Sequence, residues 1–226
     1  MDGTLVRDGE TYAVRFERRL HHPVDRVWRA ITDQDELRKW FPDGGVELEL
    51  AIGGKVRFAA EGWEDDNELV PREGTVTQLD PPRLLEFTWG DDPLRFELTP
   101  EGDGCVLVFS QTFDGKAAAP RLAAGWTICL GNLDALLDGT AAESADWFPL
   151  YEQYAKQFGD EPTVDGEGVV RVERVVARPK GEVEKALRGD DATRFQLIEA
   201  GDRTIVLCTS AGGDPNELQE RIEQLA

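Results

Sequence analysis

The sequence predicts an α+β fold in which an antiparallel sheet packs against one long helix, followed by a smaller α+β unit. Three patterns lead to this prediction: an alternating strand followed by helical spacing, a series of short strands joined by turns, and a long amphipathic stretch. Consecutive strands with helices gathered before and after them are typical of α+β domains. A chain of 226 residues is long enough for one full domain and a small second one.

The first elements are a strand and two short helices. Residues 12–20 alternate between apolar and charged side chains, which predicts a half-buried strand. We expect Pro23 to occupy the first position of a helix, because proline loses no hydrogen bond there. Asp33 and Glu36 have capping-box spacing and predict a second short helix that includes Trp40.

Residues 46–113 predict an antiparallel meander of six short strands with tight connections. Gly53-Gly54 is a hairpin signal between the first two strands. The acidic residues 61–74 are expected to form a long loop after the second strand. The expected strands are VELEL (46–50), KVRFA (55–59), GTVTQL (74–79), LLEFTW (84–89), LRFELT (94–99) and CVLVFSQTF (105–113).

A long amphipathic helix is expected over residues 120–138, and a further helix ends at Gly159. In the long helix the apolar side chains recur every three or four residues, which places them on one face. They are Leu122, Trp126, Leu130, Leu133 and Leu137.

The remaining residues predict a separate unit, so we divide the chain into domains 1–159 and 160–226. Residues 160–168 have the composition of a linker. Residues 168–187 align without a gap on residues 12–31, so this stretch is either a partial internal repeat or a chance likeness. Two strands and a final helix capped by Asp214 follow.

Composition excludes several classes of function. A net charge of −20 repels phosphate backbones and anionic lipids, so no nucleic acid and no membrane partner is expected. No long apolar run and no signal peptide are present, which makes a cytoplasmic protein the expectation. Cys105, Cys129 and Cys208 have no metal or disulfide spacing and are expected to be buried thiols.

The two histidines, His21 and His22, are interpreted as the connection between a strand and a helix. Neighbouring side chains on a strand point to opposite faces, so both cannot bind one metal ion from the same side. Nucleophile and phosphate-loop motifs are absent, and paired acids such as Asp91 and Asp92 are read as solvated turn charges. We therefore assign no catalytic residue, no metal site and no cofactor, and do not expect an enzyme.

The order of these elements and four segments together resemble a known family: the bacterial relatives of the C-terminal domain of the activator of the heat-shock-protein-ninety ATPase. That family belongs to the START-related superfamily of lipid carriers and polyketide cyclases. The resemblance implies a helix-grip fold, in which a curved antiparallel sheet wraps the long C-terminal helix and leaves a cavity, and it does not cover the tail from about residue 160. The segments are HPVDRVWRAITDQDELRKWF (22–41), IGGKVRF (52–58), GTVTQLDPPRLLEFTW (74–89) and GWTICLGNLDALLDG (125–139).

The resemblance also implies a ligand site between sheet and helix. It places Trp40 and Phe41 at one mouth and Trp126, Leu130 and Leu133 along the inner face of the long helix. Strand alternation sends further aromatic side chains to one side of the sheet. They are Phe58, Phe87, Trp89, Phe96 and Phe109, with Trp63 in the neighbouring loop. The alternative for all these residues is simple core packing.

Three polar residues could face this cavity: Arg18, Gln111 and Glu61. An inward arginine needs a partner, so Arg18 either balances a structural acid or anchors an acidic ligand. Cavities of this kind are lined mainly by apolar groups with a few polar anchors.

Three functions follow as hypotheses. The first is non-enzymatic binding of a small hydrophobic or amphipathic ligand. The second, implied by the family, is a co-chaperone role in the stress response, with stimulation of a heat-shock ATPase. The third is a cyclase or hydrolase acting on a hydrophobic substrate. The strand expected in VVRVERVV (169–176) has an edge that could pair with the main sheet or with a second copy, so a homodimer is a further hypothesis.

Overall fold

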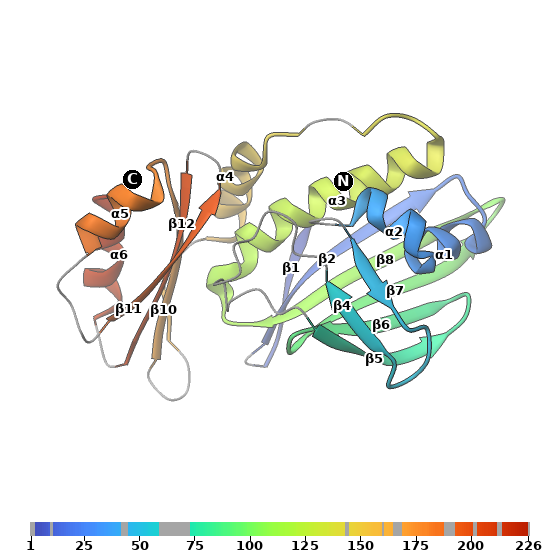
Figure 1. Cartoon of the computed structure of the whole chain (residues 1–226), viewed down its shortest axis with the longest axis horizontal. Helices are drawn as coiled ribbons and strands as arrows, with labels where there is room; N and C mark the ends of the chain where they lie inside the picture. Colours follow the sequence, from blue (N-terminus) through green and yellow to red (C-terminus); the bar gives the residue numbers. More distant parts are fainter. Residues whose placement is uncertain are drawn as a thin grey trace.

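The described residues form two antiparallel sheets, each packed against helices (Figure 1). The computed structural model describes residues 3–9, 11–41, 45–58, 73–142, 145–159, 161–164, 169–187, 193–200, 203–211 and 214–225. The large sheet, the long helix and the smaller unit confirm the α+β, helix-grip prediction.

The first sheet has eight strands in the order β1-β2-β8-β7-β6-β5-β4-β3. The expected six-strand meander therefore runs from β3 to β8, and β2 pairs with β8 so that Phe16 lies opposite Phe109. The strands are β1 (Thr4–Asp8), β2 (Thr11–Leu20), β3 (Val46–Leu48), β4 (Lys55–Phe58), β5 (Glu73–Asp80), β6 (Leu84–Trp89), β7 (Asp92–Glu101) and β8 (Gly104–Asp114).

Two short helices, α1 (Val24–Thr32) and α2 (Gln34–Trp40), follow β2 as expected. Pro23 has extended backbone angles and precedes the helix, so it is the capping residue rather than the first helical one. Asp33 caps α2 by accepting hydrogen bonds from the backbone N–H groups of Asp35 and Glu36. The second half of a capping box is absent here, because the Glu36 carboxylate instead binds arginines of α1.

The long helix α3 (Ala119–Asp138) crosses the inner face of the eight-stranded sheet and begins after the 3₁₀ helix η2 (Lys116–Ala118) (Figure 1). Ala123 and Ala124 bring its first half close to its neighbours, and the fully buried Leu130 and Leu133 fill the core under its second half. The helix ends at Gly139, whose φ of 67° is the left-handed conformation common at this position. Helix α4 (Trp147–Phe158) then packs along α3.

Two strands were not expected from the sequence. β1 pairs with β2 through the turn at Gly9, whose φ is 62°. Its side chains are mostly exposed, so no apolar alternation marks it. The short β9 (Thr163–Val164) lies inside the expected linker and pairs with β10 (Val169–Val176). Both strands lie at sheet edges, where burial imposes little pattern on the sequence.

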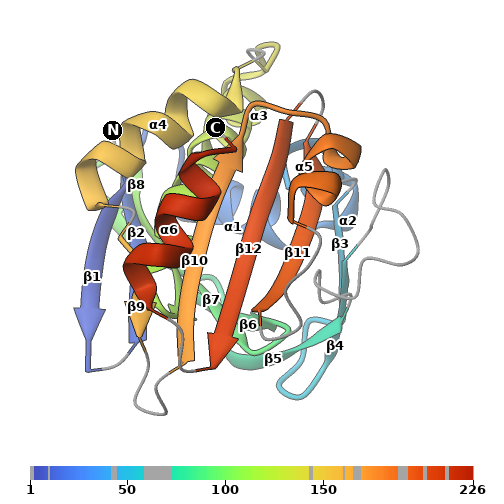
Figure 2. The same cartoon turned by 90° about the vertical axis from the view of Figure 1, so that its left-hand side faces the viewer.

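The second sheet has four strands in the order β11-β12-β10-β9. One face carries Val170, Val172 and Val176. It packs against the helices α5 (Lys180–Leu187) and α6 (Pro215–Glu223), which lie in front of the sheet in Figure 2. The opposite face carries Val175 and Ile205, which join the core of the first unit. The remaining elements are β11 (Thr193–Ala200) and β12 (Arg203–Ala211).

The segment expected as a partial repeat has the same local order as its counterpart. β10 leads through Pro179 into α5, as β2 leads through Pro23 into α1. β2 pairs with β8, the strand before α3, and β10 pairs with β12, the strand before α6. Common descent of the two segments, and the division at residue 159, remain proposals.

No helix in the described part of the chain is long and apolar enough to cross a membrane.

Candidate functional site

An aromatic cluster fills the end of the large sheet at which α3 begins. The ends of the strands explain this position. β4 and β6 end, and β7 begins, at the same end of the sheet at which β8 leads into α3. Trp126 of α3 lies with its ring centroid 4.2 Å from that of Phe109, and Phe58 stacks on Trp89 at 4.5 Å and 8°. The aromatic cluster consists of Phe41, Phe58, Phe87, Trp89, Phe96, Phe109 and Trp126.

Phe41 is the central ring of the aromatic cluster. It follows the C-terminus of α2 and lies within 6.4 Å, between centroids, of four other rings of the cluster, in addition to the neighbouring Trp40. Those four rings come from β4, β6 and α3, so Phe41 connects the short helices to both the sheet and the long helix. Trp89 is the half-buried member of the cluster, so it lies where the cluster meets the solvent.

Trp40 lies deeper than expected. It is 1% exposed, donates its indole N–H to the carbonyl oxygen of Ala30 at 2.9 Å, and meets Phe96 edge-on. Trp40 therefore holds α2 against α1 and the sheet, and does not lie at the mouth of a cavity. Leu130 and Leu133 are fully buried on the inner face of α3, as the spacing predicts. Trp63 and Glu61 lie outside the described residues.

Gln111 supplies a buried polar side chain to the aromatic cluster. It is 4% exposed, and its oxygen accepts the indole N–H of Trp126 at 2.6 Å. Its nitrogen donates to the Oδ2 atom of Asp92 at 3.0 Å. Both functions of the amide are thus used, and they join α3, β8 and β7. A buried amide costs little when its hydrogen bonds are made and much when they are lost.

Asp92 is a functional candidate that the sequence interpretation missed. It was read as a solvated turn charge beside Asp91, but it begins β7 and is half-buried. Burial raises the pKa of its carboxyl group, while the hydrogen bond from Gln111 and the charge of Arg121 act in the opposite direction. The signal that could have identified Asp92 is its position at the start of the strand that follows Trp89.

Arg18 lies away from the aromatic cluster. It pairs with Leu107 of β8, whereas Gln111 pairs with Val14, so four residues or roughly 13 Å of strand separate the two polar side chains. The guanidinium lies 6.0 Å from the ring centroid of Phe16. Its neighbour is Asp134 of α3, whose pKa is raised by burial and lowered in part by the charge of Arg18.

The surroundings of Arg18 support its role as the balance for a structural acid. The Nε atom of Arg18 and the Oδ1 atom of Asp134 are both buried and make no hydrogen bond in the described structure. Their attraction is therefore electrostatic rather than a direct ion pair.

The histidines lie in the bend between β2 and α1, as interpreted. His21 is exposed, and the Nε2 atom of His22 lies 2.8 Å from the Oδ1 atom of Asp138. Within the described ranges no three metal-ligating side chains gather at one place. The three cysteines are buried and form no disulfide, which confirms their prediction as buried thiols.

A partly buried ion pair joins the second unit to the first, close to the aromatic cluster. The Nε atom of Arg121, on the first turn of α3, donates to the Oε1 atom of Glu173 on β10 at 2.6 Å. Glu173 is 5% exposed, and burial raises the pKa of its carboxyl group against the opposing charge of Arg121. Sequence reasoning missed this pair because its members are 52 residues apart.

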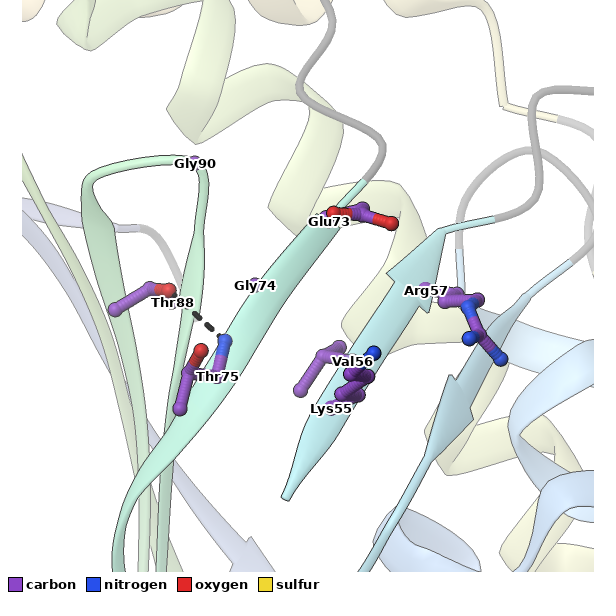
Figure 3. A pocket seen from close by; sticks show the side chains of 8 residues that line it. All are labelled: Lys55, Val56, Arg57, Glu73, Gly74, Thr75, Thr88 and Gly90. Atoms are coloured by element: carbon purple, nitrogen blue, oxygen red, sulfur yellow. Dashed lines mark hydrogen bonds between the residues drawn. The ribbon is translucent and has the colours of Figure 1, made fainter. Parts of the chain in front are cut away.

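Two hollows lie outside the aromatic cluster. One, of about 320 Å³, lies between β4 and β5 and is drawn in Figure 3, where Thr75 and Thr88 are joined by a hydrogen bond. The other, of about 180 Å³, lies between the two units and is lined in part by Gly115, Thr163 and Arg171. None of the predicted ligand-binding residues lines either hollow.

Comparison with known proteins identifies the first unit. Residues 21–138 match the family model described as "Activator of Hsp90 ATPase homolog 1-like protein". No curated protein matches the chain.

Solved structures show the same fold. A conserved protein of unknown function from Enterococcus faecalis is 24% identical, with a TM-score of 0.57 over 69% of this chain and 89% of its own. CalU16 from Micromonospora echinospora is 21% identical, with a TM-score of 0.52 over 70% and 92%. A protein from Bordetella parapertussis is 28% identical, with a TM-score of 0.50 over 70% and 89%.

Proposed function

The chain belongs to the family of activator-of-Hsp90-ATPase-homolog-1-like proteins, and on this premise we propose that its aromatic cluster binds a small, uncharged aromatic or amphipathic ligand without catalysing a reaction. The observation that carries the proposal is the pairing of a buried amide, Gln111, with a set of contacting aromatic rings at one end of the sheet. Ligand sites are mainly apolar surfaces with a few polar groups that fix orientation.

The polar surroundings favour an uncharged ligand. Asp92 lies beside Gln111 and would repel a carboxylate or a phosphate. The nearby cation, Arg121, already donates to Glu173. A hydroxyl group fits better, because it can donate to the second lone pair of the Gln111 oxygen or accept from the second N–H of its nitrogen, which the bonds to Trp126 and Asp92 leave over.

A ligand must replace ring contacts that the protein makes with itself. Trp89 is the side chain that would move, since it is half-buried and its ring contacts are with Phe41 and Phe58. Losing two such pairs costs about 1–3 kcal/mol. Burying about 200 Å² of apolar ligand surface gains about 5 kcal/mol, so entry is favourable before the cost of association is counted. The remaining gain of about 2–4 kcal/mol corresponds to a weak site with a Kd of about 1 mM or higher.

Arg18 is left out of the proposed site. Its charge acts on Asp134, and its guanidinium lies by Phe16, which is not a member of the aromatic cluster. Leu130 and Leu133 are included only as the apolar wall behind Phe96 and Phe109.

The test compares three two-ring compounds that differ in one substituent: 2-naphthol, naphthalene and 2-naphthoate. Isothermal titration and thermal shift are expected to rank binding as 2-naphthol, then naphthalene, then 2-naphthoate. Gln111→Met should weaken 2-naphthol about five- to tenfold, the value of one hydrogen bond, and leave naphthalene unchanged. The control is Gln157→Met, whose amide bonds the Gly3 carbonyl at a distance from the cluster.

Absence of binding by all three compounds, or equal binding of 2-naphthoate, would contradict the proposal. Stimulation of a heat-shock ATPase by the same ligand-free protein would favour the co-chaperone hypothesis instead.

A further inference from the structure

The second unit docks on the first through the face of its sheet that does not carry α5 and α6. Val175 and Ile205 of that face belong to the core of the first unit. At the edge of the contact, the guanidinium of Arg203 lies 3.9 Å from the ring centroid of Phe148 and 3.7 Å from Asp146. Glu173 lies on the same docked face, because its neighbour Val172 points to the opposite face of the strand, which packs against α5 and α6. The docked face therefore combines apolar contacts with one buried carboxylate.

Arg121 lies between two carboxylates. It donates to Glu173 at 2.6 Å, and its charge also acts on Asp92. No direct ion pair joins Arg121 to Asp92, although the structure describes both residues. Asp92 instead accepts the hydrogen bond from Gln111. Asp92 is therefore acted on both by the amide of Gln111 and by the charge of Arg121.

We propose that Glu173 is a positioning residue for the aromatic cluster: by holding Arg121, it keeps Asp92 on Gln111, and Gln111 in turn orients the indole of Trp126. Three hydrogen bonds make up this chain, Glu173 with Arg121, Asp92 with Gln111 and Gln111 with Trp126, and the attraction between Arg121 and Asp92 links the first to the second. A cation beside an unpaired carboxylate forms a charge-assisted hydrogen bond, about twice as strong as a neutral one. Without Glu173, Arg121 turns to Asp92 and draws it away from Gln111.

This inference gives the second unit a specific task. In a chain without the second unit, Arg121 would have only solvent and Asp92 as partners. The polar side chains of the proposed ligand site, Asp92 and Gln111, would then be arranged differently. Only the ligand arm of the inference rests on the proposed function.

The test uses the full chain and the variant Glu173→Gln, which keeps the size and an acceptor oxygen but removes the charge. The readout is the ¹H–¹⁵N resonance of the Trp126 indole, because that N–H donates directly to Gln111. Glu173→Gln is expected to move this resonance and to weaken 2-naphthol binding about five- to tenfold. Glu223→Gln, which breaks the Arg174–Glu223 pair inside the second unit, should do neither.

A second variant separates positioning from simple undocking. Arg121→Met with Glu173→Gln removes the cation as well as the carboxylate, so no charge of the pair is left uncompensated and Asp92 has no cation to turn to. The Trp126 resonance should return to its wild-type position in this double variant. Amide hydrogen exchange of β10 reports whether the units stay docked in each protein.

An unchanged Trp126 resonance in Glu173→Gln overturns the inference, and so does a double variant that stays as shifted as the single one. A shifted and restored resonance in a protein that binds none of the naphthalene compounds would keep the inference and reject the proposed function.

Discussion

The indole N–H of Trp126 donates a 2.6 Å hydrogen bond to the side-chain oxygen of Gln111, and both side chains are almost completely buried. This bond ties the long helix to β8 at the place where the aromatic rings meet. It also makes Trp126 serve two purposes, since its ring packs on Phe109 while its N–H satisfies the amide.

Trp126→Phe is expected to destabilise the protein by about 1–3 kcal/mol, because the oxygen of Gln111 is left buried without a donor. Urea unfolding measures the change. The double variant Trp126→Phe with Gln111→Met should recover part of the loss, since neither polar group then remains. A double variant that is merely the sum of its single changes would show that the two side chains are energetically independent.

Gly74→Ala is expected to disrupt the pairing of β5 and β6. A Cβ atom at this position would collide with the carbonyl oxygen of Thr88, which belongs to the backbone and cannot move aside easily. The matched control is Gly131→Ala on α3, where nothing lies within 4 Å of the added carbon. That variant should be more stable by about 0.5–1 kcal/mol, from helix propensity. Equal melting temperatures for the two variants would contradict the strand geometry.

Asp92→Asn is expected to raise the melting temperature at neutral pH. Burial raises the folded pKa of Asp92 above its unfolded value of about 3.9. Its carboxyl group therefore contributes stability below that unfolded pKa, and the contribution is lost as the pH rises through the folded pKa. Asparagine does not ionise, so the advantage of the variant should shrink toward pH 4.

The charged groups that act on Asp92 are Arg121, Asp114 and Asp91. Asp91→Asn is the control, because Asp91 is exposed and its removal should change the melting temperature little at any pH. A melting temperature of Asp92→Asn below wild type at pH 7 would mean that attraction to Arg121 outweighs the cost of burial.

His22→Ala is expected to cost less than about 1 kcal/mol, since its partner Asp138 is mostly exposed. Ligand binding should not change. Val27→Ala in the next helix, a fully buried position, should cost about 2 kcal/mol or more and serves as the comparison. Loss of ligand binding in His22→Ala alone would reopen the question of a functional histidine.

Much of the fold could be predicted from local patterns. Alternation predicted that Phe58, Phe87 and Phe109 lie on one face of the sheet. Spacing of three and four residues predicted that Leu130 and Leu133 lie on the buried face of α3. Both predictions succeed because burial repeats with the period of each element. β1 escaped because its side chains are mostly exposed, so no period marks it.

The polar part of the candidate site could not be predicted in this way. Asp92 has the composition of a turn residue, and only the three-dimensional approach of Gln111 and Arg121 changes its surroundings. The pairing of Arg121 with Glu173 depends on how two units dock, and no local period encodes a contact over that separation.

The most direct test of the ligand site is to locate 2-naphthol on the protein by intermolecular nuclear Overhauser effects. The account predicts contacts from the naphthol protons to the rings of Phe58, Phe109 and Trp126, with the hydroxyl end at Gln111. Contacts confined to the hollow between β4 and β5, at Lys55 and Thr88, would contradict it.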